Sequence, residues 1–149
     1  MSLEEEIHQK KFRNEFHKLG VNLIYTHNWL ISRYSDVFKK FDITEQQFNI
    51  LRILRGAHPG PLPVNSLKER MLDKMSDASR LVERLRLKGL VKRSECAEDR
   101  RKVDVMITDE GLALLKEIDK YENEFDKCFK ELSESEAQTI NYLLDKLRG

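Results

Sequence analysis

Three consecutive basic residues, Arg100, Arg101 and Lys102, stand directly before a run of alternating apolar residues. The alternation places three β-branched side chains on one face of an expected strand, Val103, Val105 and Ile107. A shorter strand is expected over residues 90–93, so the basic residues would form the tip of a β-hairpin. Like charges crowded at an exposed tip repel one another, which favours a polyanion as their binding partner.

A second group of basic residues lies on one face of a helix predicted over residues 76–88. Spacings of three, one and three place four apolar residues on its inner stripe, Ala78, Leu81, Val82 and Leu85. Ser76 is the expected N-cap, and Gly89 fits the position just past the helix end. A solvated charged face would explain such a helix alone. The order helix, glycine, strand, basic tip, strand favours a helix that enters a DNA groove, followed by a hairpin wing.

The order of these elements resembles the MarR family of winged helix–turn–helix transcription regulators. The matching residues are 80–85, 88–91, Arg93, 99–101, Val105, 107–108 and Gly111. The family's wing pattern, Asp-x-Arg followed by an apolar strand and Thr-x-x-Gly, is complete, and the resemblance extends over nearly the whole chain. It implies a mainly α fold with a small β-hairpin wing (α+β), with long N- and C-terminal dimerisation helices.

The resemblance also implies a function. A homodimer would bind double-stranded DNA at a palindromic operator, as a repressor that a small-molecule ligand releases. The residues expected in the major groove lie on the recognition helix: Ser76, Ser79, Arg80 and Arg84. The wing residues Arg100, Arg101 and Lys102 are expected at the minor groove, where a narrow groove concentrates negative potential.

The charged neighbours of these residues are expected to have supporting roles. Asp99 would pair with a wing arginine and fix the hairpin's shape, and Glu83 would pair with Arg80 or Arg84. The remaining basic residues are expected to contact phosphates or water, which adds affinity and salt dependence without sequence specificity: Arg86, Lys88, Lys92 and Arg93.

An effector pocket is implied where the long helices meet the winged domain, for a small aromatic or anionic compound. The candidates lie near the end of the first helix: His27, Trp29, Arg33 and Tyr34. An aromatic stripe at helical spacing is also what a packed core would show.

The charge of the chain is unevenly distributed along its 149 residues. Residues 67–102 hold 12 Lys and Arg against 7 Asp and Glu, a net of +5, whereas residues 109–149 hold 6 against 11, a net of −5. A basic middle beside an acidic end fits a local surface for nucleic acid. No apolar run approaches the roughly 20 residues that span a bilayer, and the first residues are acidic, so we expect a cytoplasmic protein without membrane partners.

Signatures of catalysis are lacking in the sequence, and we expect no enzyme, no metal and no cofactor. The chain has no Gly-rich phosphate loop or nucleophile elbow, and its four histidines are scattered without metal-ligand spacing. Cys96 lies beside the basic tip, where a thiol is more easily oxidised, but peroxide-sensing members of the family use a cysteine near the first helix, and this chain has none there. The alternative function is a dimeric winged-helix protein-interaction module without specific DNA binding.

The remaining helix signals predict one domain over residues 1–149. Its winged helix–turn–helix would occupy 41–108, and the dimerisation helices 1–40 and 109–149. Ser2 would open a first helix of about thirty residues, and Thr44 a second helix that ends near Gly56. The proline-rich residues 56–63 are expected to form a loop before a short helix over 65–72. Thr108 would cap a helix with a heptad pattern to Leu132, and Ser133 a last helix with four apolar residues inward: Ala137, Ile140, Leu144 and Leu147.

Overall fold

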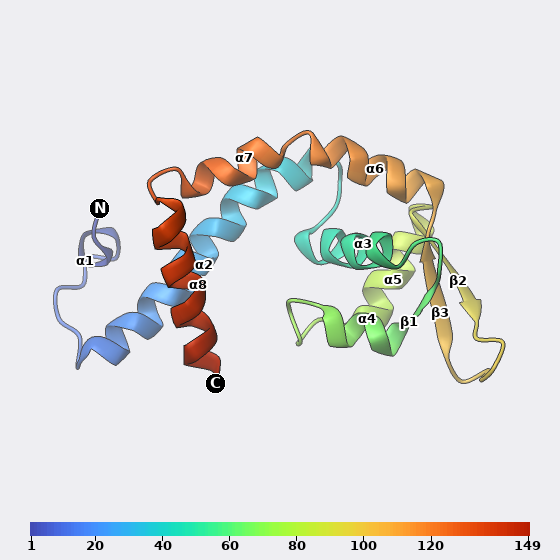
Figure 1. Cartoon of the computed structure of the whole chain (residues 1–149), viewed down its shortest axis with the longest axis horizontal. Helices are drawn as coiled ribbons and strands as arrows, with labels where there is room; N and C mark the ends of the chain where they lie inside the picture. The colour runs from blue at the N-terminus through green and yellow to red at the C-terminus, as the bar shows by residue number, and fades with distance from the viewer.

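The central part of the chain folds into a winged helix–turn–helix domain, and the terminal helices form an arm beside it (Figure 1). The computed structural model describes all residues from 1 to 149. The domain contains α3 (Glu45–Ala57), β1 (Leu62–Pro63), α4 (Val64–Arg70), α5 (Ala78–Leu87), β2 (Val91–Glu95) and β3 (Val103–Ile107). The predicted class, mainly helical with a small sheet, is confirmed.

Helix α3 begins where its capping residues predict. The Thr44 side chain accepts a hydrogen bond from the Gln47 amide at 3.2 Å, and the Gln47 side chain accepts one from the Thr44 amide at 3.0 Å. This reciprocal pair satisfies two amides that an α-helix leaves unpaired at its start. Ile43 and Phe48 belong to one apolar cluster, as expected for a hydrophobic staple.

The small sheet has three strands in the order β1-β3-β2, and both pairings are antiparallel. The hairpin of β2 and β3 is the predicted wing, with Val91 opposite Ile107 and Glu95 opposite Val103. The prediction that residues 56–63 are all loop was wrong, because β1 pairs with β3 through Leu62 and Pro63. A proline that lacks an N–H is tolerated on an edge strand, and two residues are too few to show alternation.

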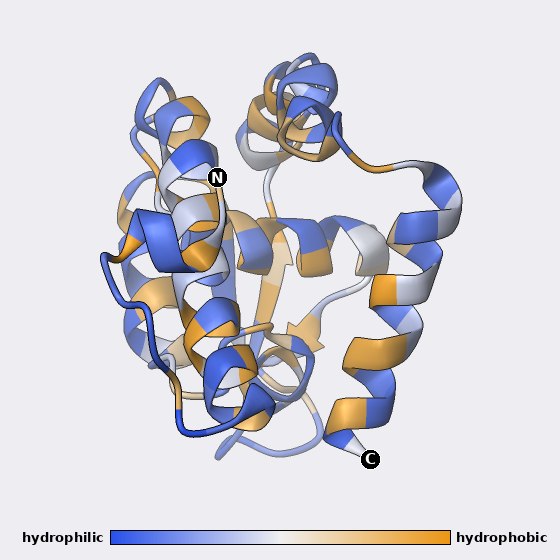
Figure 2. Cartoon of the chain, turned by 90° about the vertical axis from the view of Figure 1, so that its left-hand side faces the viewer, coloured by the Kyte–Doolittle hydropathy of each residue, from blue (hydrophilic) through white to orange (hydrophobic).

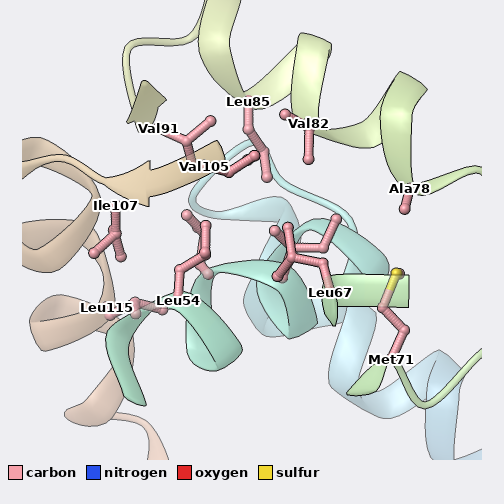
Figure 3. Packing of buried hydrophobic residues seen from close by; sticks show 12 residues of the cluster. Leu54, Leu67, Met71, Ala78, Val82, Leu85, Val91, Val105, Ile107 and Leu115 are labelled. Atoms are coloured by element: carbon pink, nitrogen blue, oxygen red, sulfur yellow. The ribbon is translucent and has the colours of Figure 1, made fainter. Parts of the chain in front are cut away.

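One apolar core joins the helices and the sheet of the winged domain (Figure 3). Its fully buried members come from every layer: Leu51 and Leu54 of α3, Leu67 of α4, Val82 and Leu85 of α5, Val105 of β3 and Leu115 of the following helix α6 (Asp109–Asp119). The inner stripe predicted for residues 76–88 therefore faces this core. Leu87, which lies outside the stripe, is 71% exposed.

The arm consists of α1 (Leu3–Glu6), α2 (Glu15–Lys39), α7 (Glu122–Asp126), the 3₁₀ turn η1 (Lys127–Phe129) and α8 (Glu134–Arg148). Helix α6, which packs on the core of the winged domain, leads into it. The expectation of one long helix from Ser2 was wrong. Ser2 does form its capping box, but His8 adopts a left-handed φ of 53° and the short helix ends. Asn14 then caps α2 by accepting from the His17 amide at 2.8 Å, so the chain holds two helix starts.

The continuous helix predicted from Asp109 to Leu132 is also interrupted. α6 ends at Asp119, and Tyr121 has a φ of −98° and a ψ of 10°, outside the helical range. The bend places the Tyr121 ring against Phe41, with ring centroids 5.7 Å apart, and under Lys40 at 4.8 Å. Contacts with the end of α2 therefore accompany the break in the heptad pattern.

Helix α8 begins at the predicted cap, Ser133, but none of its residues is buried. Its apolar side chains were expected to point inward, yet Ile140 is 42% exposed and Leu147 is 56% exposed. Figure 2 shows these apolar segments in orange along the helix that ends at the C-terminus. No helix of the structure has the length and apolarity required to cross a membrane.

Candidate nucleic-acid interface

Helix α5 is the element that presents the first group of basic residues. It begins at Ala78, and its N-cap is Asp77, whose carboxylate accepts from the Arg80 amide at 3.1 Å. The prediction of Ser76 as the cap was therefore wrong by one residue. Ser76 lies in the preceding turn, where its amide donates to the Asp73 carbonyl. Aspartate caps as well as serine does and adds a negative charge at the positive end of the helix dipole.

The other end of α5 is closed by Gly89, as predicted. Gly89 has a φ of 74°, which a residue with a side chain rarely adopts. Its amide donates to the Arg86 carbonyl at 2.9 Å, and the Leu90 amide donates to the Leu85 carbonyl at 3.0 Å. These two bonds make a Schellman motif, which ends the helix and directs the chain into β2.

Thr108 ties the end of α5 to the start of α6. Its hydroxyl donates to the Gly89 carbonyl at 2.7 Å and accepts from the Gly111 amide at 3.1 Å. Its own amide donates to the Leu90 carbonyl at 3.1 Å. A Cβ at Gly111 would lie 2.4 Å from the Leu90 carbonyl oxygen, so only glycine allows this approach. The Thr-x-x-Gly pattern thus has a structural cause.

The basic side chains of α5 fall into two classes. Glu83 accepts two hydrogen bonds from Arg86, at 2.7 and 2.9 Å, and lies 3.3 Å from Arg93 of β2. The prediction that Glu83 pairs with Arg80 or Arg84 was therefore wrong. Both of these arginines are exposed and make no ion pair. The Arg86 hydrogen bonds hold the pKa of Glu83 below its usual value, so the carboxylate stays charged.

The two lysines nearby differ in the same way. Lys88, just past the end of α5, lies 3.7 Å from the Asp42 carboxylate and also donates to the Asp42 carbonyl. Lys92 on β2 is exposed and forms no ion pair. The structure therefore leaves Arg80 and Arg84 of α5 and Lys92 of β2 exposed and without an ion-pair partner.

The wing tip presents the second group of basic residues. The Cys96 amide donates to the Lys102 carbonyl at 2.9 Å and closes the hairpin beyond the ladder. Arg100, Arg101 and Lys102 are all exposed and form no ion pair. Figure 1 shows this tip projecting from the domain at the end of β2 and β3.

Asp99 shapes the tip through the backbone. Its carboxylate accepts from the Arg101 amide at 2.9 Å, and its carbonyl accepts from the Lys102 amide at 3.0 Å. The predicted pairing of Asp99 with a wing arginine was wrong, because no such ion pair forms. An aspartate that accepts from the amide two residues on is a common turn former, and here it leaves both arginines free.

A cavity of about 210 Å³ lies where α2, α3, α6 and α7 meet. Of the four pocket candidates only Tyr34 lines it, and burial raises the pKa of its hydroxyl. His27, Trp29 and Arg33 are exposed and do not line it, and the Arg33 guanidinium stacks 4.6 Å above the Trp29 ring. The lining residues that the sequence did not reveal come from all four helices: Phe38, Phe48, Arg52, Arg55, Ile118, Asp119, Glu122 and Phe125.

Comparison with known proteins identifies the family. The sequence model of the MarR family matches residues 43–103. The HTH-type transcriptional regulator PecS of Dickeya dadantii is 34% identical over 123 residues, which cover 79% of this chain and 73% of PecS. A variant of E. coli MarR complexed with operator DNA superposes with a TM-score of 0.82 at 26% identity, over 93% of this chain and 99% of that one. The chain belongs to the MarR family.

A second solved relative is regulated by a small molecule. BpsR of Bordetella bronchiseptica, whose DNA binding is regulated by 6-hydroxynicotinic acid, superposes with a TM-score of 0.77 at 25% identity. The likeness covers 89% of this chain and 99% of BpsR. As a MarR-family protein, the chain is a transcriptional regulator of the winged helix–turn–helix class.

Proposed function

We propose that this MarR-family regulator binds a palindromic operator as a homodimer and represses transcription until a small anionic aromatic effector releases it. The observation that carries the proposal is the division among the α5 arginines. Arg80 and Arg84 are exposed and unpaired, whereas Glu83 neutralises Arg86 and Arg93. A free guanidinium on a recognition helix can donate twice to a guanine edge. The relative solved with operator DNA supports the same function.

The residues proposed for the two grooves differ in what they read. Ser79, Arg80 and Arg84 would contact base edges and phosphates in the major groove, with Ser76 in the turn before them. Arg100, Arg101 and Lys102 would reach the minor groove through its negative potential. A twofold dimer would hold two such units about one DNA turn (~34 Å) apart. The proposal also places the protein in the cytoplasm, with no catalytic activity of its own.

Selection of bound DNA from a random duplex library tests this function, with the oligomeric state measured by sedimentation. We expect an enriched palindrome whose half-sites lie about one turn apart, bound by a dimer. A dimer that enriches no sequence at low salt would contradict operator binding and would favour the protein-interaction module instead.

Paired variants then test the division among the arginines. Arg80→Ala should weaken operator binding by about 1–3 kcal/mol and relax the base preference. Arg86→Ala is the matched control on the same helix, and it should change binding far less because Glu83 already occupies that guanidinium. Equal losses for the two variants would contradict the assignment of base contacts.

A third variant tests the wing. Arg101→Ala should weaken binding to all sequences similarly and should lower the slope of log affinity against log salt by about 1. Glu98→Ala at the same tip serves as the control, since it removes an exposed side chain of opposite charge and should strengthen binding slightly. A change of base preference with Arg101→Ala would contradict a shape-based contact.

The effector site that we propose is the cavity beside Tyr34. Aromatic rings form much of its wall: Phe38 lies 4.6 Å from Phe48, and Tyr34 lies 4.8 Å from Phe125 between ring centroids. Arg52 and Arg55 supply two guanidinium groups at the same cavity, whose wall also holds the carboxylates of Asp119 and Glu122. An apolar wall with few convergent charged groups is the usual form of a small-ligand site, and the guanidinium groups suit a carboxylate.

A further inference from the structure

Helix α6 is attached to the winged domain at both of its ends. At its start, the Thr108 hydroxyl joins the Gly111 amide to the Gly89 carbonyl at the end of α5. At its last residue, the Asp119 carboxylate accepts from Arg55 of α3 at 2.8 Å. Between these ends Leu115 and Ile118 are buried. An 11-residue helix is about 16 Å long, so α6 connects the recognition helix to the effector cavity as one rigid element.

The ion pair at the far end of α6 is placed in the wall of that cavity. Both Arg55 and Asp119 line it, together with the acidic Glu122. The Arg55 side chain is 35% exposed and the Asp119 side chain 40% exposed. An ion pair that is this accessible to water contributes little net free energy and exchanges easily. A ligand carboxylate can therefore take over the Arg55 guanidinium.

We infer that Arg55 is the switch of this regulator: it holds Asp119 in the DNA-binding state and the carboxylate of the effector in the released state. An anion on Arg55 repels the freed Asp119 and Glu122, which moves the end of α6 away from α3. The motion reaches α5 because Thr108 hydrogen-bonds to the Gly89 and Leu90 backbone. The inference rests on the proposed function and adds to it the residue that couples the two sites.

Operator affinity in a double-mutant cycle tests the ion pair without any ligand. Arg55→Gln and Asp119→Asn should each weaken operator binding about fivefold, the lower end of typical allosteric coupling. The double variant should be no weaker than the weaker single one, because both changes break the same contact. Lys120→Gln is the control, since Lys120, the residue after α6, pairs only with Glu117, at 3.0 Å. Additive losses, or single variants that bind like wild type, would overturn the switch.

Benzoate and its neutral analogue benzamide test the exchange itself. Benzoate at millimolar concentration should weaken operator binding by the wild-type protein about fivefold, and benzamide should not. The operator affinity of Asp119→Asn should no longer respond to benzoate, because the end of α6 is already released in this variant. That of Arg55→Gln should not respond either, because this variant lacks the guanidinium that binds the carboxylate. Equal responses in all three proteins, or none in the wild type, would overturn the inference. A wild-type protein that binds no operator would instead contradict the proposed function.

A further variant separates the two ends of α6. Thr108→Val removes the hydroxyl that contacts Gly89 but leaves Arg55 and Asp119 in place. Calorimetry should show that benzoate still binds, while the response of operator affinity is smaller than in the wild type. Thr108→Ser retains the hydroxyl and should respond fully. A full response from Thr108→Val would show that the signal reaches α5 by another route.

Discussion

The winged domain and the terminal arm differ in how completely they bury their own apolar residues. In α5, three of the ten residues are buried, and Leu67, Leu85 and Val105 of the same core have no exposed surface. In α8 none of the fifteen residues is buried. The winged domain therefore completes its core within one chain, whereas the arm leaves apolar surface that a second copy would cover.

The local helix signals do not explain this difference. Ser133 and Glu136 form a reciprocal capping box at the start of α8, and Thr44 and Gln47 form the same box at α3. Both helices are equally well started, but α3 has four buried residues and α8 has none. Packing, and not capping, separates the domain from the arm, in keeping with the small contribution that propensity makes to helix stability in proteins.

The largest effect is expected from a charge placed on the apolar stripe of α8. Ile140, Leu143 and Leu147 follow one another at helical spacing and are 42%, 52% and 56% exposed. If a second copy covers this stripe, Leu143→Asp buries an unpaired charge in each copy, at about 3–5 kcal/mol each. The dissociation constant of the dimer, measured by sedimentation, should rise more than about 100-fold.

The winged domain should be unaffected by this change. Near-ultraviolet and amide-exchange signals of the α3–α5 core should remain those of the wild type. Gln138→Asp is the control, because residue 138 lies roughly 140° around the helix from residue 143. A dimer that tolerates Leu143→Asp as well as Gln138→Asp would show that α8 lies outside the interface.

A smaller effect is expected from a cavity in the complete core. Leu67→Ala removes a side chain with no exposed surface and should lower the free energy of unfolding by about 2–5 kcal/mol. Leu87→Ala, on the 71% exposed face of α5, is the matched control and should remain within about 0.5 kcal/mol. Denaturant titration measures both. Similar losses at the two positions would mean that the α5 surface is covered in the native assembly.

Sequence reasoning succeeded for most structures that depend on neighbouring residues, although it placed the cap of α5 one residue early, at Ser76 instead of Asp77. The caps at Thr44, Thr108 and Ser133, the glycine after α5 and the hairpin with its basic tip all follow from local patterns, and all were confirmed. Each involves residues within a few positions of one another, where hydrogen-bond geometry leaves few choices.

Most of the errors arose where the partners of a residue are decided by distant parts of the chain. On its own helix, Glu83 lies three positions from Arg80, one from Arg84 and three from Arg86. It pairs with Arg86, and the position of Arg93 on β2 helps to favour that partner. The effector cavity brings together Tyr34, Arg55 and Phe125, which no spacing in the sequence relates. The heptad pattern from Asp109 correctly marked the apolar face but not the bend at Tyr121, which packs on Phe41 just past the end of α2.

Thr108→Val should have an intermediate effect on the free energy of unfolding. It allows the loss of a helix cap beside the winged domain, at the start of α6, to be compared with the loss of one in the arm, at the start of α8. The loss of an N-cap hydroxyl typically costs about 0.5–2 kcal/mol. Thr108 also donates to the Gly89 carbonyl, so its variant should fall in the upper half of that range. Ser133→Ala removes a similar cap from α8. Beyond the cap, the Ser133 hydroxyl bonds only the exposed Ser135 hydroxyl, at 3.1 Å, so the loss should fall in the lower half. Denaturant titration of both variants measures the difference, and a larger loss at Ser133 would contradict it.

The smallest effect is expected from Glu83→Gln, and it has opposite signs for stability and for DNA binding. Because its bonds with Arg86 hold the folded pKa of Glu83 below its usual value, the charge of Glu83 stabilises the fold above that usual value. The contribution is lost as the pH falls through the folded pKa. The wild type should therefore be slightly more stable than the variant at pH 7, and the difference should vanish once the pH is below the folded pKa of Glu83.

The same variant frees Arg86 and Arg93, which Glu83 neutralises in the wild type. Its affinity for nonspecific DNA should rise, with a steeper dependence on salt, since two more guanidinium groups can contact phosphates. Glu98→Gln, at the wing tip and without an ion pair, is the control for the change of net charge alone. A rise no larger than that of Glu98→Gln would mean that Arg86 and Arg93 point away from the DNA, which would leave Arg80 and Arg84 as the only arginines of this face that bind it.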